Sequence, residues 1–460
     1  MRVHLALLAA LTLSACQSGR PVASLVVVGQ YVVTGNAAGQ VLSPGAVAIN
    51  GDLIIEVGDR DAILAKYTVK EVVDASNQIV LPGLVNTHTH APMVLYRGLA
   101  DDLALKEWLE RYIFPAEAKT VTPAFVRTGT RLAVLEMIES GTTTYADMYY
   151  FEEEIASVTR AAGVRGVLGQ TIIKFPVADA KTPAEELTRT EAFIKAFRGD
   201  ALIVPAVAPH AIYTLDRDIL VASAALGRQY GVPILIHLAE TEVERTDSLA
   251  AHQQSPTAYL ESLGFWSPRT VAAHGVWVDD DDIAILARRN VGVSHNPESN
   301  MKLSSGIAPV ARYKAAGVTL GLGTDGAASN NDLDMFEAMR QAAFLAKLAT
   351  KDPTAVPARE ALAMATSGGA RVLGLQDSIG SLEAGKRADL ITVAIDSARE
   401  TPLYDPISHL VYVTRGDDVR TTIVNGRILM LNRRLFTLDR AQVLADARSV
   451  AASVQAAVGR

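Results

Sequence analysis

The chain has 460 residues, of which 49% are hydrophobic and 20% charged, which is enough for one large globular domain and a smaller one. The formal net charge is −7 and no run of five or more Lys and Arg occurs, so a nucleic-acid partner is not expected, because phosphate backbones are bound through clustered cations. Cys16 is the single cysteine, which excludes an intramolecular disulfide and a thiolate metal site.

The first 21 residues are predicted to be a signal peptide and tether. Arg2 precedes an apolar stretch over residues 5–13, which is too short to span a bilayer as a helix. The following Leu13-Ser14-Ala15-Cys16 resembles a bacterial lipobox, so we expect lipidation at Cys16, a cell-envelope location and membrane contact through the lipid anchor only. Gln17 favours the outer membrane in a Gram-negative host. The alternative is an ordinary secretory signal with an incidental cysteine.

Residues 22–80 and 385–460 are predicted to form one small β-sandwich from the two ends of the chain. Short β-branched runs are separated by turns such as Asn50-Gly51-Asp52. The same pattern of strand-like runs and turns recurs at residues 389–393 and 421–428. The tail, about residues 439–458, is Ala-rich with helical spacing and predicts a terminal helix.

Residues 81–384 alternate apolar runs with longer amphipathic segments, which predicts an α/β domain with a buried parallel sheet. Eight such runs fit a (β/α)8 TIM-type barrel: 79–85, 142–146, 164–168, 202–207, 232–236, 270–273, 291–293 and 318–322. A doubly wound open sheet is the alternative. It is disfavoured because no Gly-rich phosphate fingerprint follows the first strand.

Polar residues with metal-binding side chains fall at the predicted strand ends. They are His88, His90, His210, His237, His274 and Asp325. In a barrel the carboxyl ends of the strands meet at one mouth, so these side chains are expected to converge. His88, His90, His237 and Asp325 would give the ligand set of a catalytic zinc site with room for water. Taken singly, each histidine could be structural and Asp325 a turn former; their coincidence at successive strand ends favours the metal site.

The chain resembles the amidohydrolase superfamily at several separated motifs. The first is Pro82-Gly83-Leu84-Val85-Asn86-Thr87-His88-Thr89-His90. The others are His237-Leu238-Ala239-Glu240, His274-Gly275, residues 294–303, Gly323-Thr324-Asp325 and residues 380–390. Within the superfamily, the chain most resembles the 5-methylthioadenosine/S-adenosylhomocysteine deaminases and their chlorotriazine-hydrolase relatives.

The resemblance implies a role for each residue of the site. The metal would lower the pKa of a bound water so that hydroxide attacks the ring. Glu240 would shuttle the water proton to a ring nitrogen, His274 would orient the hydroxide, and Asp325 would accept a second proton as ammonia leaves. Read without the resemblance, Glu240 could be a solvated loop carboxylate.

The resemblance also bears on the number of metal ions. Binuclear members bridge two ions with a carboxylated lysine at the end of the fourth strand, and residues 202–210 contain no lysine. One divalent ion per chain, Zn²⁺, is therefore expected. The cysteine-ligated zinc deaminases need a C-x-x-C that this chain lacks.

By position, Trp108 matches the family's stacking tryptophan, Glu117 its ribose-binding glutamate and His210 a substrate-facing histidine. Trp108 could equally belong to the core and Glu117 to a helix surface. The family's arginine on the third strand is not evident in Leu168-Gly169-Gln170-Thr171. A carboxylate-bearing tail such as that of S-adenosylhomocysteine is therefore expected to be held poorly.

The sequence thus predicts a metal-dependent deaminase of an adenine nucleoside: methylthioadenosine, adenosine or a substrate like S-adenosylhomocysteine. The alternatives on the same scaffold are a guanine or 8-oxoguanine deaminase and an s-triazine hydrolase. A rival of another class is a nucleoside-binding lipoprotein without catalysis, which the presence of Glu240 disfavours, because a binder needs no proton shuttle. The sequence leaves the oligomeric state open.

Overall fold

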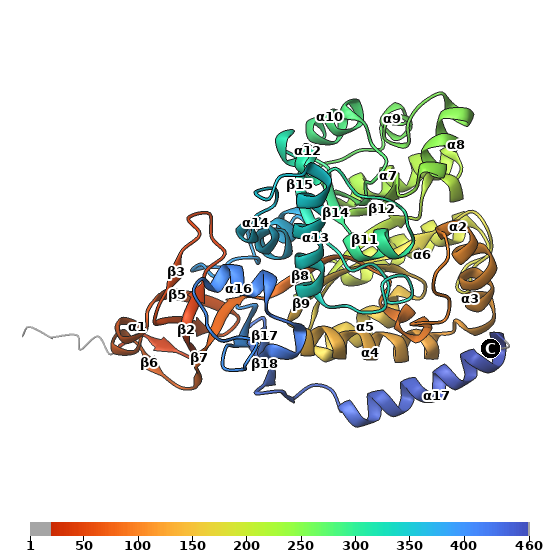
Figure 1. Cartoon of the computed structure of the whole chain (residues 1–460). Helices are drawn as coiled ribbons and strands as arrows, with labels where there is room; N and C mark the ends of the chain where they lie inside the picture. The colour runs from red at the N-terminus through yellow and green to blue at the C-terminus, as the bar shows by residue number, and fades with distance from the viewer. Residues whose placement is uncertain (1–19, 459–460) are drawn as a thin grey trace, which may run out of the picture.

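The structure is a computed structural model that describes residues 20–458. A closed barrel lies beside a smaller nine-stranded sheet, and strands from both ends of the chain enter that sheet (Figure 1). Cys16 and most of the predicted signal and tether lie outside the described residues. Within residues 20–458, no helix combines the length and the apolar character that crossing a membrane requires.

The predicted eight-stranded parallel barrel is confirmed. Its strands are β8 (Leu84–Thr89), β9 (Thr142–Tyr149), β10 (Arg165–Ile172), β11 (Ile203–Pro209), β12 (Ile234–Leu238), β13 (Thr270–His274), β14 (Gly292–His295) and β15 (Thr319–Leu322), and β15 pairs with β8 to close the ring. Every residue of β9, β10, β12 and β13 is buried, as expected for parallel strands covered on both faces.

Helices cover the outside of the barrel between successive strands (Figure 1). The main ones are α4 (Pro123–Ser140), α5 (Glu152–Ala162), α6 (Pro183–Phe197), α7 (Arg217–Tyr230), α8 (Glu242–His252), α9 (Pro256–Ser262), α10 (Asp280–Arg288), α12 (Val310–Ala315), α13 (Met335–Thr350) and α14 (Ala358–Ala363). Helix α4 illustrates how capping residues in the sequence determine where a helix begins and ends. Thr122 caps the start by accepting from the Phe125 amide, and Gly141 ends the helix at a φ of 89°.

The smaller sheet runs in the order β19-β18-β17-β16-β7-β2-β4-β5. Its bounds are β2 (Leu25–Val33), β4 (Gly45–Asn50), β5 (Leu53–Asp59), β7 (Val72–Pro82), β16 (Leu390–Ala394), β17 (Val419–Val424), β18 (Arg427–Leu431) and β19 (Arg434–Leu435), and the two-residue β3 (Val41–Leu42) pairs with β2. The antiparallel pair β7–β16 joins the N-terminal and C-terminal segments.

The sheet folds over on itself, as the predicted sandwich requires. A Cβ added at Gly426, between β17 and β18, would lie 2.0 Å from the carbonyl oxygen of Gly51, between β4 and β5. The two turns therefore touch, although their strands are far apart in the sheet order. One buried cluster spans both halves and includes Val27, Val47 and Ile423.

The chain passes from the small sheet to the barrel at Gly83. The predicted first run, residues 79–85, is therefore divided: β7 ends at Pro82 and β8 begins at Leu84. A side chain would not fit at Gly83, because its Cβ would lie 2.1 Å from Oγ1 of Thr143. The apolar run continues across the junction because residues on both sides of it are buried, and hydrophobicity alone cannot mark the boundary.

A buried ion pair ties the barrel to the small sheet. Arg165, at the start of β10, donates to Asp389 from Nε at 3.0 Å and from Nη2 at 3.2 Å. The Asp389 carboxylate also accepts from the amide of Asn425. The terminal helix α17 (Arg440–Val458) packs against α3 (Phe114–Thr120) and α4, so it covers the barrel rather than the small sheet (Figure 1).

Candidate active site

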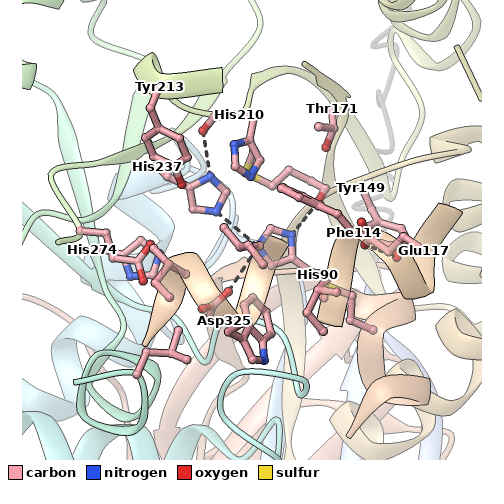
Figure 2. Close-up of a pocket in the computed structure, with 18 of the residues that line it drawn as sticks. His90, Phe114, Glu117, Tyr149, Thr171, His210, Tyr213, His237, His274 and Asp325 are labelled. Atoms are coloured by element: carbon pink, nitrogen blue, oxygen red, sulfur yellow. Dashed lines mark hydrogen bonds and ion pairs between the residues drawn. The ribbon is translucent and has the colours of Figure 1, made fainter. Parts of the chain in front are cut away.

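The histidines and the aspartate named above gather at one end of the barrel. His88 lies in β8 and His90 directly follows it, His237 lies in β12, and Asp325 follows β15 by three residues. Figure 2 shows His90, His237 and Asp325 facing one another, with His274 and His210 beside them. The carboxyl ends of the strands thus bring these residues to a single mouth.

Three imidazoles and one carboxylate surround a common point. The Nε2 atoms of His88 and of His90 each lie 3.3 Å from Oδ1 of Asp325. The Nε2 atoms of His90 and His237 are 3.3 Å apart. His88, His90 and Asp325 form one cluster with donor atoms spaced for a metal ion, and His88, His237 and His274 form a second that shares His88.

Backbone carbonyls fix the ring tautomers of two of these histidines. Nδ1 of His90 lies 2.7 Å from the carbonyl oxygen of Met148, and Nδ1 of His237 lies 2.8 Å from that of His210. A carbonyl oxygen can only accept, so both Nδ1 atoms carry hydrogen and both Nε2 atoms are turned toward the common point. Metal-binding histidines are oriented in this way in proteins.

The electrostatics of the cluster favour a cation between the donors. Burial lowers the pKa of His88 to about 4 and holds that of His237 well below its usual value. Burial also opposes charge on His90, but the hydrogen bond and negative charge of Asp325 outweigh it and raise the pKa to about 9. Burial would raise the pKa of Asp325, yet its contacts with His88 and His90 hold it well below the usual range. The donor set therefore fits a divalent metal ion.

Glu240 and His274 form a second pair at the edge of the cluster. Oε2 of Glu240 lies 3.7 Å from Nε2 of His274, and Ser305 donates to Oε1 at 3.3 Å. Both side chains are buried, and burial raises the pKa of Glu240, with the charge of Asp325 acting in the same direction. A buried acid with a raised pKa beside an imidazole can both accept and return a proton.

Strained backbone occurs at three positions of the site. Ala239, His274 and Asp325 have φ values of 45°, 73° and 64°, in the left-handed region that residues with a Cβ rarely adopt. Ala239 immediately precedes Glu240. Such strain persists only where the surrounding structure enforces it, and it gathers at functional sites.

The pocket extends from the cluster of metal-binding side chains toward the residues that are expected to bind the substrate. Trp108, Glu117 and His210 all line it, together with Thr171 and Tyr149. Glu117 lies on the opposite side of the pocket from His274 (Figure 2). Tyr149 donates to Glu117 at 2.7 Å, and burial raises the pKa of Glu117 to about 7. Glu117 is thus a buried pocket residue and not a surface charge of its helix.

The indole of Trp108 is buried, and its Nε1 has no hydrogen-bond partner among the described residues. Burial lowers the pKa of His210 to about 3, so its ring is neutral, and Nδ1 lies 3.0 Å from Oγ1 of Thr214. On the third strand, Gln170 donates to Asp179 at 2.8 Å, while Thr171 faces the pocket. No arginine stands among the residues that line this pocket.

Sequence reasoning gave no role to several residues that hold the site. Ser299 and Ser329 donate to Oδ2 of Asp325 at 2.6 and 2.8 Å. Asn300 contacts His274, and Glu244 accepts from the amides of Ala239 and Glu240, at 2.9 Å each. Ser299 and Asn300 lie inside the motif at residues 294–303, and Thr241-x-x-Glu244 is the signature of a helix start. The motif and the helix-start signature can both be found in the sequence. Neither of them predicts which catalytic loop the side chains of Ser299, Asn300 and Glu244 support.

Comparisons with known proteins bear on this site. The sequence model described as the amidohydrolase family matches residues 79–429. A 5-methylthioadenosine/S-adenosylhomocysteine deaminase of Syntrophobacter fumaroxidans is 46% identical over 433 residues, covering 94% of this chain and 99% of the relative. A 5′-deoxyadenosine deaminase of Methanosarcina mazei is 43% identical over 438 residues, covering 95% and 99%. The crystal structure of a zinc-bound adenosine deaminase from Xanthomonas campestris has a TM-score of 0.94 at 38% identity, covering 95% of this chain and 100% of the other.

These comparisons correct the predicted cell-envelope location. The two relatives are matched over 99% of their own length and carry the names of nucleoside deaminases, not of envelope lipoproteins. The prediction rests on a short apolar run and one cysteine, whereas the similarity extends over more than nine-tenths of the chain. The predicted location at the cell envelope is therefore wrong.

Proposed function

Because the chain belongs to the amidohydrolase family, we propose that it is a metal-dependent hydrolase that releases ammonia from the adenine ring of a nucleoside. The observation that carries the proposal is the meeting of three imidazoles and a carboxylate beside the Glu240–His274 pair at one mouth of the barrel. The similar proteins are deaminases named for methylthioadenosine, S-adenosylhomocysteine, 5′-deoxyadenosine and adenosine, all adenine nucleosides, which supports the substrate class.

His88, His90, His237 and Asp325 would hold one divalent ion, and the nitrogen-rich donor set with one carboxylate suits Zn²⁺. The absence of a lysine from β11 supports a single ion. When bound, the ion supplies Lewis acidity, which lowers the pKa of water toward neutrality.

The side chains then divide the proton transfers of the hydrolysis. Water adds to the ring carbon that bears the amino group, and Glu240 takes the proton from the water and gives it to the neighbouring ring nitrogen. His274 faces Glu240 through Nε2 and orients the attacking oxygen. Asp325 accepts the second proton and passes it to the departing amino group, so that ammonia leaves and the ring keeps a carbonyl oxygen. Ser299 and Ser329 hold Oδ2 of Asp325, which leaves Oδ1 turned toward the imidazoles.

Three residues would recognise the nucleoside. The Glu117 carboxylate would accept hydrogen bonds from the ribose hydroxyls, and its burial makes such bonds strong. Trp108 offers an apolar face and an indole N–H that has no other partner among the described residues. The neutral ring of His210 lines the same pocket and would contact the base.

A substrate panel tests the proposal. Adenosine, 5′-deoxyadenosine, methylthioadenosine, guanine, 8-oxoguanine and an s-triazine are each mixed with metal-loaded enzyme, and ammonia release is measured. Turnover of the adenine nucleosides with weak or no turnover of the others is expected. Preferred turnover of guanine or of the s-triazine contradicts the substrate class. Nucleoside binding without ammonia release contradicts the enzymatic function.

A further inference from the structure

A second, larger cavity opens beside the catalytic pocket. The catalytic pocket has a volume of about 60 Å³, and the outer cavity, called here the outer chamber, has about 620 Å³. The two share five lining residues: Leu105, Leu109, Phe114, Tyr213 and Leu303. These shared side chains border both spaces, so the catalytic pocket and the outer chamber lie side by side.

The catalytic pocket by itself cannot enclose a whole substituted nucleoside. Pockets that bind small molecules usually measure roughly 300–1,000 Å³, well above 60 Å³. Glu240 and Glu117 both line the inner pocket, so the base and the ribose are placed there. A substituent on the 5′ carbon of the ribose then has the outer chamber as its adjoining space.

One side of the outer chamber is apolar. The Phe114 and Phe175 rings meet edge to face with their centroids 5.2 Å apart, and both line the chamber. Leu105, Leu303 and Trp277 extend this surface. An alkyl or thioether chain would bury its CH2 groups against these side chains, and each fully buried CH2 favours binding by about fourfold.

The charged groups of the outer chamber are mostly negative. Glu110, Glu242 and Asp247 are exposed lining residues, and Lys106 is the one cation in the lining. None of these four side chains forms an ion pair within residues 20–458. Glu244 also lines the chamber, but its carboxylate accepts from two backbone amides and is not free for a ligand. The free charges therefore favour an ammonium group at the end of a substituent and disfavour a carboxylate.

We propose that the outer chamber receives the 5′-substituent of the nucleoside and selects uncharged or cationic thioether tails over tails that end in a carboxylate. This inference rests on the proposed adenine-nucleoside deamination and adds the class of 5′-substituent. Apolar contacts with Phe114 and Phe175 hold the chain of the tail. The charges of Glu110, Glu242 and Asp247 decide which end group is accepted.

A series of substrates that share adenine and ribose tests the selectivity. The tails are none (5′-deoxyadenosine), methylthio, butylthio, 3-aminopropylthio and 3-carboxypropylthio, and kcat/KM is measured for each at low and high salt. We expect butylthio to exceed methylthio at least about fivefold. We expect the ammonium tail to exceed the carboxylate tail about tenfold at low salt, with a smaller ratio at high salt because exposed charges are screened.

The series separates failure of this inference from failure of the proposed function. Turnover of 5′-deoxyadenosine with no gain from longer tails, or with the carboxylate tail preferred, overturns the outer-chamber assignment and leaves the deaminase intact. Absence of ammonia release from every member overturns the proposed function, and this inference with it.

Variants identify the side chains that select the tail. The triple change Glu110→Gln, Glu242→Gln, Asp247→Asn should lower the ammonium-to-carboxylate ratio to about 1 or below, because Lys106 is then the one free charge in the lining. Phe175→Ala should reduce the gain from methylthio to butylthio. Glu107→Gln is the matched control: Glu107 lies on the same segment as Glu110, pairs with Arg111 and does not line the chamber. An equal loss of selectivity in this control would also overturn the assignment.

Discussion

Asn300 accepts a hydrogen bond at Oδ1 from Nδ1 of His274, at 2.9 Å, and both side chains are buried. With Nδ1 protonated, Nε2 of His274 is turned toward Glu240, 3.7 Å away. Asn300 thereby fixes the orientation and the tautomer of the imidazole.

Removing this contact should impair catalysis without emptying the metal site. Asn300→Ala lets the His274 ring rotate and change tautomer, so we expect kcat to fall about 10- to 100-fold with metal content near wild type. Asn300→Asp keeps an acceptor oxygen for Nδ1 of His274, so it should recover part of the activity. Loss of metal in Asn300→Ala, measured by elemental analysis, would make His274 a ligand.

The four donors around the common point should hold about one divalent ion per chain. His88→Ala and Asp325→Ala each remove a donor and should abolish most of the bound metal and the activity together. His210→Ala is the matched control for metal content, which should stay near wild type. The ring of His210 lines the pocket without belonging to either cluster of donors. Two tightly bound ions per wild-type chain would contradict the single site.

Glu240→Gln should separate proton transfer from binding. The amide keeps the size of the side chain but cannot accept a proton, so kcat should fall by roughly 10²–10⁴-fold. Metal content and nucleoside affinity should stay near wild type, since the loss is expected in the transition state. Stopped-flow turnover, calorimetric binding and elemental analysis check the three parts. Undiminished turnover would remove Glu240 from the mechanism.

Glu117 should matter only for substrates with ribose hydroxyls. Glu117→Ala is expected to lower kcat/KM for adenosine about 10- to 100-fold, and to change that for 2′,3′-dideoxyadenosine much less. A similar loss on both substrates would mean that Glu117 supports the fold of the pocket through Tyr149 instead.

The same residue predicts a pH dependence. Burial raises the pKa of Glu117 to about 7, so below this pH the neutral acid predominates and above it the carboxylate forms. If the carboxylate accepts the ribose hydroxyls, KM for adenosine should fall as the pH rises through about 7. Glu117→Gln should flatten this dependence, which initial rates across pH 5.5–8.5, roughly 1.5 units either side of that pKa, will check.

The Arg165–Asp389 pair should stabilise the junction of barrel and sheet. Asp389→Ala leaves a buried guanidinium without its partner, which costs about 3–5 kcal/mol in the free energy of unfolding. Thermal unfolding of the purified protein measures the effect. Glu107→Gln breaks an exposed pair and should leave the unfolding transition in place. Equal shifts in both variants would contradict a special role for the buried pair.

The sequence by itself determined the barrel and the position of its mouth. Runs of buried, β-branched residues alternate with amphipathic segments, and this periodicity is a local property that burial on both faces imposes. Because parallel strands in a barrel present their carboxyl ends on one side, His88, His90, His237 and Asp325 could be expected to meet although they are spread over more than 230 positions.

Only the tertiary structure decided how those residues are held. The bonds from Ser299 to Asp325, from His274 to Asn300 and from Arg165 to Asp389 join different elements, and in the last case the partners are 224 positions apart. The division of residues 79–85 at Gly83 is of the same kind, because both sides are equally apolar. The local spacing of apolar residues in the sequence predicts whether a side chain is buried. The partner that the side chain contacts depends on how the strands and loops pack around it.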